Sequence, residues 1–125
     1  MNRFTNRQSI NNVEVALDIE MVISMAPGLS KVIVYEGTGA NANAILNRMA
    51  TDNLAKQLSS SWGFGSQVDP AREQIFQQFA AQGQSMFQAS GDGGAWTGAI
   101  FPPSDDPWLT VVGGTSLDTV TSGGA

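Results

Sequence analysis

Hydrophobic residues near the start of this chain follow first a helical and then a strand-like spacing. Residues 13–25 are apolar except at Glu14, Asp18, Glu20 and Ser24, and the Pro27-Gly28 pair follows them. This block predicts a helix that ends before the proline. Residues 31–35, Lys-Val-Ile-Val-Tyr, are rich in β-branched side chains and predict a buried strand. The first part of the chain is therefore interpreted as a helix followed by a strand.

The middle of the chain predicts two further helices. Residues 42–58 fit a helix that breaks near 51–53, although residues 57–61 also fit a strand. Residues 70–82 fit a helix that opens with proline directly after Asp69, a good N-cap residue. The apolar stripe of this helix consists of Ile75, Phe76 and Phe79.

Two more strands are predicted, at residues 85–89 and 108–112. Strands that alternate with helices favour a parallel sheet covered by helices on both faces. We therefore expect an α/β fold, a three-layer αβα arrangement with a mainly parallel sheet. In such sheets, functional sites lie at the carboxyl ends of the strands.

The chain contains neither histidine nor cysteine. This excludes a Ser-His-Asp triad, a cysteine nucleophile and a His or Cys metal site. Acid-base chemistry would then fall to carboxylates, and Glu14 and Asp18 lie four residues apart, on one face of the predicted helix. When two carboxyls are crowded together, repulsion between their negative charges raises the pKa of one of them. That carboxyl can then act as a general acid or base. The alternative is structural: residues 11–14 also fit a helix cap with an acid in the first turn, which leaves Asp18 as a solvated surface acid.

Composition and charge narrow the possible partners. The 125 residues, 42% of them hydrophobic, suit one compact domain, with a polar arm at 1–12 and a frayed tail at 121–125. The net charge is -5 and the six basic residues are scattered, so we expect no nucleic-acid partner. No apolar run reaches membrane-spanning length, and the arm lacks the apolar stretch of a signal peptide.

A glycine-containing loop follows the predicted strand at 31–35. Residues 36–41, Glu-Gly-Thr-Gly-Ala-Asn, superficially resemble a phosphate-binding turn before a helix. The third glycine of that motif is missing, as is an acid about twenty residues further on at a strand end. A plain strand-to-helix loop is the better interpretation, with a small-ligand site at residues 37–41 as a weaker alternative.

Four short motifs follow one another along the chain. Glu14-Val-Ala-Leu-Asp18 precedes an Ala-Pro-Gly turn at 26–28 and the predicted strand at 31–35. A Ser-Trp-Gly sequence ends the run 59–63, and a Ser-Gly-Asp-Gly-Gly turn occupies 90–94. The fourth motif is Phe-Pro-Pro, followed by a predicted strand that leads into Gly-Gly-Thr, at residues 101–103 and 108–115.

The motifs, in this order, resemble the sedolisin family, serine-carboxyl peptidases that have a subtilisin-like fold and use glutamate in place of the histidine base. The resemblance runs from about Asn12 onward, with Gly93 where the family usually has serine. It implies a partial subtilisin-like domain, in which residues 57–61 include a strand. It also implies a secreted, extracellular or periplasmic setting and a peptide or protein substrate.

The resemblance assigns roles to individual residues. Glu14 would be the general base for a nucleophilic serine, Asp18 would orient and charge-balance it, and Asp92 would stabilise the oxyanion. Asp92 must be protonated to donate that hydrogen bond, which couples the chemistry to acidic pH. Ser61, Trp62 and Gly63 would bind the substrate backbone by β-augmentation, and Gly91 would also belong to the substrate-binding residues.

The nucleophile itself is the main departure from the family pattern. The family serine lies in a Gly-Thr-Ser-x-x-x-Pro segment beyond the Gly-Gly-Thr strand, and the 125 residues contain no such segment. Ser116 follows Gly-Thr but lacks the proline, so we interpret it as structural. The family calcium site is also formed by C-terminal residues, so we expect no metal or cofactor in this chain.

The sequence thus predicts a central fragment, or a shortened relative, of an acid-active serine-carboxyl endopeptidase that is inactive alone. The alternative is a non-catalytic binding or assembly module derived from the peptidase fold. Its exposed apolar faces would pair with another copy, giving a homo-oligomer, or with the remainder of the domain.

Overall fold

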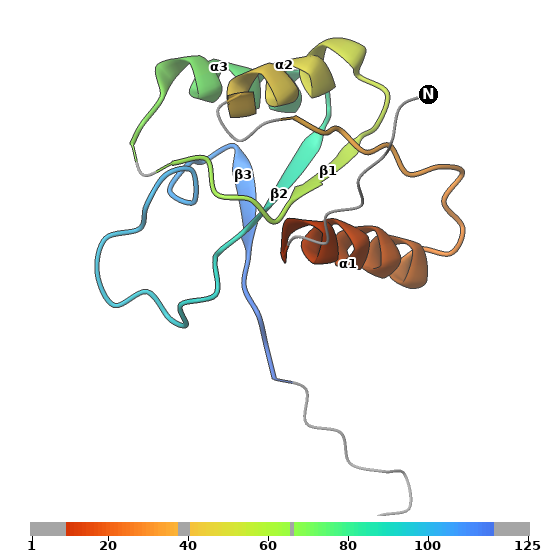
Figure 1. Ribbon diagram of the computed structural model, residues 1–125. Coiled ribbons are helices and arrows are strands. Elements are labelled where there is room, and N and C mark those ends of the chain that lie inside the picture. Colours follow the sequence, from red (N-terminus) through yellow and green to blue (C-terminus); the bar gives the residue numbers. More distant parts are fainter. Residues whose placement is uncertain (1–9, 38–40, 66, 117–125) are drawn as a thin grey trace, which may run out of the picture. The chain divides into compact units, whose positions relative to one another are not determined.

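The computed structural model describes residues 10–37, 41–65 and 67–116 and divides the chain into two compact units, Met1–Ala55 and Lys56–Ala125 (Figure 1). In the first unit the described elements are the helices α1 (Ile10–Met25) and α2 (Ala42–Asp52). The second contains β1 (Gln57–Ser60), α3 (Pro70–Ala81), β2 (Ser85–Ala89) and β3 (Leu109–Val112).

Helix α1 confirms the helix predicted at 13–25 and begins three residues earlier, at Ile10. It ends at Met25, where Pro27 cannot continue a helix because it lacks an N–H and restricts the residue before it. The N–H of Ala26 donates to the carbonyl of Val22 at 3.1 Å, and that of Leu29 to Ala26 at 3.1 Å, closing the chain into a turn.

Helix α2 ends at the break predicted near residues 51–53. Asn53 adopts the left-handed conformation, with φ of 46°, and its N–H donates to the carbonyl of Met49 at 3.1 Å. Asparagine tolerates this conformation better than most residues, which explains why the helix stops here.

The strand predicted at residues 31–35 is wrong: these residues form neither helix nor strand. Val32 and Val34 are exposed rather than buried. A strand requires a neighbour to satisfy its N–H and carbonyl groups, and the described part of the first unit contains no other strand. The β-branched composition of residues 31–35 was therefore not sufficient to form a strand.

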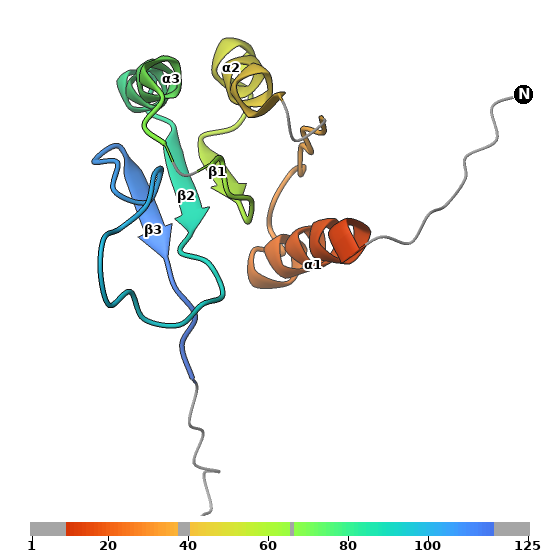
Figure 2. The ribbon, with the colours of Figure 1, turned by 60° about the vertical axis from the view of Figure 1, so that its left-hand side comes forward.

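The predicted parallel sheet is confirmed in the second unit. Its strands lie in the order β1-β2-β3, and both neighbouring pairs are parallel. Met86 in the central strand pairs with Leu58 on one side and with Leu109 on the other. Figure 2 shows the connections: α3 links β1 to β2, and a long loop at 90–108 links β2 to β3.

Helix α3 packs on the sheet through the stripe that the sequence indicated. Phe76 and Phe79 are both 1% exposed, their ring centroids lie 6.2 Å apart, and the helix contacts β2. Met86 and Leu58 are buried in the same unit. Among the described residues of this unit α3 is the helical layer, so the three-layer arrangement stays a prediction.

Asp69 caps α3 as predicted. Its Oδ1 accepts hydrogen bonds from the N–H groups of Ala71 at 3.0 Å and Arg72 at 3.4 Å, and Pro70 occupies the first helical position. These bonds satisfy main-chain donors that a helix N-terminus otherwise leaves unpaired.

Candidate functional site

The carboxyl pair Glu14 and Asp18 lies on α1. Both side chains are half-buried, whereas Glu20 on the same helix is exposed. The four-residue spacing places Glu14 and Asp18 on one face of the helix, as the sequence predicted. Their neighbours include the exposed apolar side chains of Val13 and Leu17.

The cap interpretation of residues 11–14 is wrong. Because α1 begins at Ile10, Asn11 and Asn12 lie inside the helix, and the first turn contains no acidic residue. Glu14 therefore lies in the second turn, beyond the main-chain N–H groups that a cap would satisfy. This removes one structural explanation for the glutamate.

Asp92 lies in the turn that follows β2, at the carboxyl end of the strand. Gly91 and Gly94 have positive φ angles of 93° and 79°, a conformation that glycine adopts without steric strain. The N–H of Ser90 donates to the carbonyl of Val112 at 2.9 Å, which ties the base of this turn to the end of β3. Asp92 itself is exposed.

Ser61, Trp62 and Gly63 follow the carboxyl end of β1. The N–H of Trp62 donates to Oγ of Ser60 at 3.1 Å, and Trp62 is 41% exposed. The carbonyl of Trp62 accepts a hydrogen bond from Nε2 of Gln88 at 3.0 Å. The peptide groups before and after Trp62 are therefore each held by a side-chain hydrogen bond.

The parallel sheet places two of the predicted groups at one edge. Because β1 and β2 are neighbouring parallel strands, the segment 61–63 and the Gly91-Asp92 turn both lie at the carboxyl edge of the sheet (Figure 1). Glu14 and Asp18 belong to the first unit, which is described by itself. The structure thus brings segment 61–63 and the Gly91-Asp92 turn to one end of the sheet. Glu14 and Asp18 lie on α1.

Gln88 is a residue of this edge that the sequence analysis did not identify. It is 3% exposed and lies on the same face of β2 as Met86, two residues earlier. The available signal was a long polar side chain at a position that the strand period assigns to the buried face.

The loop before β3 contains a carboxyl with a shifted pKa. Burial raises the pKa of Asp106, and the nearby charges of Glu73 and Asp105 act in the same direction. The N–H of Trp108 donates to Oδ1 of Asp106 at 2.8 Å and partly opposes this rise. The N–H of Asp106 in turn donates to the carbonyl of Pro103 at 2.9 Å, so the loop is internally bonded.

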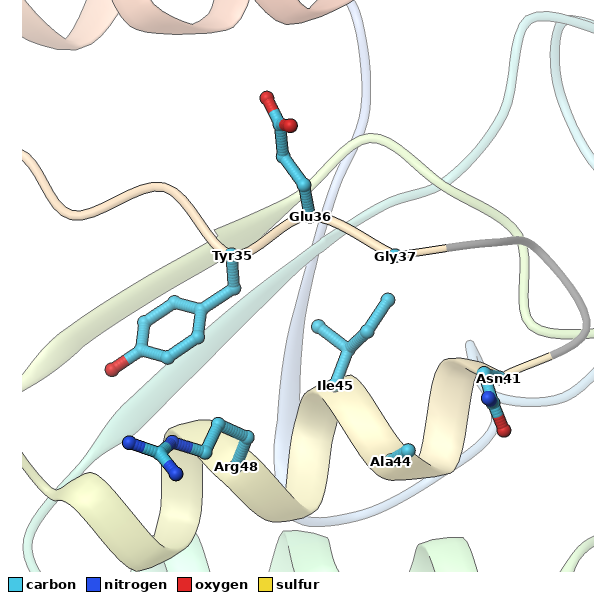
Figure 3. A pocket seen from close by; sticks show the side chains of 7 residues that line it. All are labelled: Tyr35, Glu36, Gly37, Asn41, Ala44, Ile45 and Arg48. Atoms are coloured by element: carbon cyan, nitrogen blue, oxygen red, sulfur yellow. The ribbon is translucent and has the colours of Figure 1, made fainter. Parts of the chain in front are cut away.

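A small pocket in the first unit lies beside the glycine-containing loop (Figure 3). Its volume is about 240 Å³, and its lining residues are Tyr35, Glu36, Gly37, Asn41, Ala44, Ile45 and Arg48. Residues 38–40 of the predicted ligand loop lie outside the described residues. The side chain of Asn41 makes no capping hydrogen bond at the start of α2. A small-ligand site here stays a prediction.

No group of three or more acidic side chains is placed to hold a metal ion within residues 10–37, 41–65 and 67–116. No described helix is long and apolar enough to cross a membrane.

Comparison with known proteins found three similar peptidases. The chain is 34% identical to xanthomonalisin from Xanthomonas sp. (strain T-22) over 113 residues, which cover 78% of this chain and 14% of that protein. It is 27% identical to sedolisin from Pseudomonas sp. (strain 101) over an alignment of 130 positions, covering 86% of this chain and 22% of that protein. It is also 42% identical to tripeptidyl-peptidase sed5 from Aspergillus fumigatus over 57 residues, which are 41% of this chain and 10% of that protein.

The match to each relative covers a small part of the relative's own length, at most the 22% seen for sedolisin. No family model matches the chain, and no solved structure matches it.

Proposed function

This chain is a relative of the sedolisin family, and we propose that it forms part of an acid-active serine-carboxyl endopeptidase that hydrolyses peptide bonds. The observation that carries the proposal is the 34% identity over 113 residues, a stretch that covers 78% of the chain. The same proposal includes peptide or protein substrates and a secreted or periplasmic setting.

In the proposed reaction, Glu14 is the general base. It takes the proton from a serine hydroxyl as the serine oxygen attacks the scissile carbonyl carbon, and it returns that proton to the leaving amine. Asp18 is a positioning residue that orients Glu14 from the next turn of α1. The half-buried placement of both side chains on one helix face supports this pairing.

The serine comes from a segment outside the 125 residues, since these contain no Gly-Thr-Ser-x-x-x-Pro sequence. We therefore expect the polypeptide by itself to be inactive. The proposal requires no metal ligand from this chain, because the resemblance assigns the family calcium site to C-terminal residues of the peptidase domain.

Asp92 is the proposed oxyanion stabiliser. A protonated carboxyl at the carboxyl edge of the sheet can donate a hydrogen bond to the negative oxygen that forms on the attacked carbonyl. The positive φ of Gly91 lets the chain turn sharply directly before Asp92. This role requires the protonated form of the carboxyl.

We propose that the substrate peptide pairs with the main chain of the segment Ser61-Trp62-Gly63. The carbonyl of Lys56 accepts a hydrogen bond from the N–H of Ser85 at 2.8 Å, so main-chain groups at even positions of β1 face β2. The carbonyl of Trp62 continues this pattern, because it too is bonded from β2. In an extended chain the alternate main-chain groups of this segment then point the other way, and we propose that a peptide adds there as a strand.

The experiment is a chimera in which this chain replaces the matched stretch of xanthomonalisin. We expect acid-active cleavage of a denatured protein substrate, and a fall in kcat of at least about 100-fold for Glu14→Gln, Asp18→Asn and Asp92→Asn. Glu20→Gln, on the same helix, is the matched control and should leave kcat within about twofold. An active chimera that tolerates Glu14→Gln and Asp92→Asn would contradict the assigned roles.

A second candidate function, an assembly module, is favoured by the exposed apolar side chains of α1. Val13 is 67% exposed and Met25 is 78% exposed. Apolar surface of this kind favours pairing with another copy or with the remainder of the domain. Sedimentation of the chain should then show a dimer that Val13→Lys dissociates. Labelling by a serine-reactive phosphonate, in the presence of a segment that supplies the nucleophile, would instead support the peptidase.

A further inference from the structure

Gln88 connects the two segments at the carboxyl edge of the sheet. Its Nε2 donates to the carbonyl of Trp62 at 3.0 Å and to the carbonyl of Ala89 at 3.3 Å. Trp62 lies 26 positions earlier in the sequence, directly after β1, whereas Gln88 lies in β2. One side-chain amide therefore fastens the segment Ser61-Trp62-Gly63 to the strand that carries the Asp92 turn.

Stability alone does not account for glutamine at this position. The side chain is 3% exposed, and its Oε1 is buried with no hydrogen-bond partner among the described residues. Burying an amide with an unpaired oxygen is unfavourable compared with burying an apolar side chain of similar size. Methionine occupies the equivalent inward position two residues earlier, at Met86, and is fully buried. The amide of Gln88 is better explained by the hydrogen bond that its Nε2 donates to the carbonyl of Trp62.

The bond to Gln88 also determines which groups of the segment 61–63 face a ligand. The carbonyl of Trp62 is bonded to Gln88, and its N–H is bonded to Oγ of Ser60. Both main-chain groups of Trp62 are thus used within the sheet unit, which fixes the orientation of the peptide planes on either side. Loss of the Gln88 donor would release this orientation without altering the residues that meet a ligand.

We propose that Gln88 is a positioning residue for peptide binding, which holds the segment Ser61-Trp62-Gly63 in fixed relation to the Gly91-Asp92 turn. The inference rests on the proposed function for the identity of the ligand, an extended peptide. Gln88 itself touches neither ligand nor reacting atoms. It acts through the carbonyl of Trp62.

The test uses the full chain, labelled with ¹⁵N, and the probe acetyl-Ala-Ala-Phe-amide. Gln88→Met keeps the length of the side chain and removes the donor. We expect it to speed amide hydrogen exchange at Trp62 and Gly63 at least about tenfold, and to weaken peptide binding at least about tenfold in a chemical-shift titration. These losses should exceed any change in exchange at the central strand β2, which reports general stability.

Gln84→Met is the matched control. Gln84 is 4% exposed and its Oε1 accepts a hydrogen bond from Nε2 of Gln82 at 2.8 Å, but it precedes β2 at the opposite edge of the sheet. Its substitution should leave peptide affinity and the exchange rate at Trp62 within about twofold. An equal effect of both substitutions would mean that loss of any buried amide is sufficient, and would overturn the proposal.

Gln88→Glu provides the conservative rescue. A protonated carboxyl can donate one hydrogen bond to the Trp62 carbonyl, whereas the ionised form cannot. Relative to the unsubstituted chain at each pH, this variant should bind the peptide normally at acidic pH and lose affinity as its carboxyl ionises. If Gln88→Met fails to fold, this pH series decides the question. A merely structural role predicts no such recovery of binding.

The outcomes separate the inference from the proposed function. If Gln88 controls exchange at Trp62 but the unsubstituted chain does not bind the peptide, the positioning role is supported and the peptide-binding function fails. If the chain binds the peptide and Gln88→Met leaves both affinity and exchange at Trp62 within twofold, the positioning role is overturned.

Discussion

The hydroxyl of Tyr35 donates a hydrogen bond to Oδ2 of Asp52 at 3.2 Å, although the two residues are 17 positions apart. Nε of Arg48 donates to the same oxygen at 2.8 Å. One carboxylate oxygen near the end of α2 therefore accepts hydrogen bonds from both a phenol and a guanidinium. This contact anchors residues 31–37, which form no strand, to the helix that follows them.

Tyr35 should titrate above the ordinary range for tyrosine. Burial raises the pKa of its hydroxyl above 10.0, the charge of Asp52 and the hydrogen bond to it raise it further, and Arg48 lowers it. Tyr35 is the chain's single tyrosine, so an ultraviolet absorbance titration reports it alone. We expect Asp52→Asn to lower this pKa and Arg48→Gln to raise it.

The raised pKa of Tyr35 makes the stability of the folded state depend on pH. The folded state keeps the phenol proton more tightly than the unfolded state, so this contribution is fully present below pH 10 and is lost as the pH rises through the raised pKa. An Asp52→Asn variant that titrates no lower than the unsubstituted chain would show that the carboxylate does not act on Tyr35.

Asp106→Asn should stabilise the protein at neutral pH. Burial raises the pKa of Asp106, so its ionised form is disfavoured in the folded state, and asparagine removes that charge while keeping an acceptor for the N–H of Trp108. We expect a gain of less than about 1 kcal/mol, because the side chain is partly solvated. Urea unfolding at several pH values measures it.

The pH dependence provides the control for Asp106. Below the unfolded-state pKa the carboxyl is protonated in both states, so the difference between the two proteins should shrink as the pH falls through the raised folded-state pKa and should be lost below about 4. A difference that instead grows toward acidic pH would contradict the raised pKa.

Removing the N-cap of α3 should destabilise the second unit. Asp69→Ala deletes the acceptor for the N–H groups of Ala71 and Arg72 and also the 3.4 Å ion pair with the Arg72 guanidinium. We expect a loss of about 1–2 kcal/mol in the free energy of unfolding, measured by chemical denaturation. Asp69→Asn keeps the cap and should lose less than half as much. Equal losses would assign the effect to the ion pair.

The core under α3 should be sensitive to truncation. Phe79→Ala removes a ring that is 1% exposed and contacts Phe76, and should lower the free energy of unfolding by about 3–5 kcal/mol. Phe101 is 63% exposed and is the matched control. Phe101→Ala should change stability by less than about 0.5 kcal/mol. Comparable losses for both would mean that the sheet does not pack as described.

Local sequence signals were sufficient to predict an element where its stabilising contacts join residues close together in the sequence. Asp69, Pro70 and the stripe of Ile75, Phe76 and Phe79 predicted α3 almost to the residue, because a cap and a helical period act within a few positions of each other. The same holds for the end of α2 at Asn53, where a residue that tolerates the left-handed conformation stops the helix.

Strands depend on partners that the sequence does not specify. Residues 31–35 and 85–89 both have strand-forming composition, but only 85–89 has neighbours on both sides to complete its hydrogen bonds. The pattern therefore could not distinguish them. Ser85–Ala89 becomes the central strand because β1 and β3 pair with it, not because its residues differ in kind.

By itself, the sequence determined the helices, the absence of histidine and cysteine chemistry, and the motif order that identifies the peptidase relatives. Only the tertiary structure decided that segment 61–63 and the Asp92 turn share one edge of a parallel sheet, and that Gln88 joins them. Helices and motifs arise from residues close in the sequence. The joined edge depends on a contact across 26 positions, which exists only once the strands have paired.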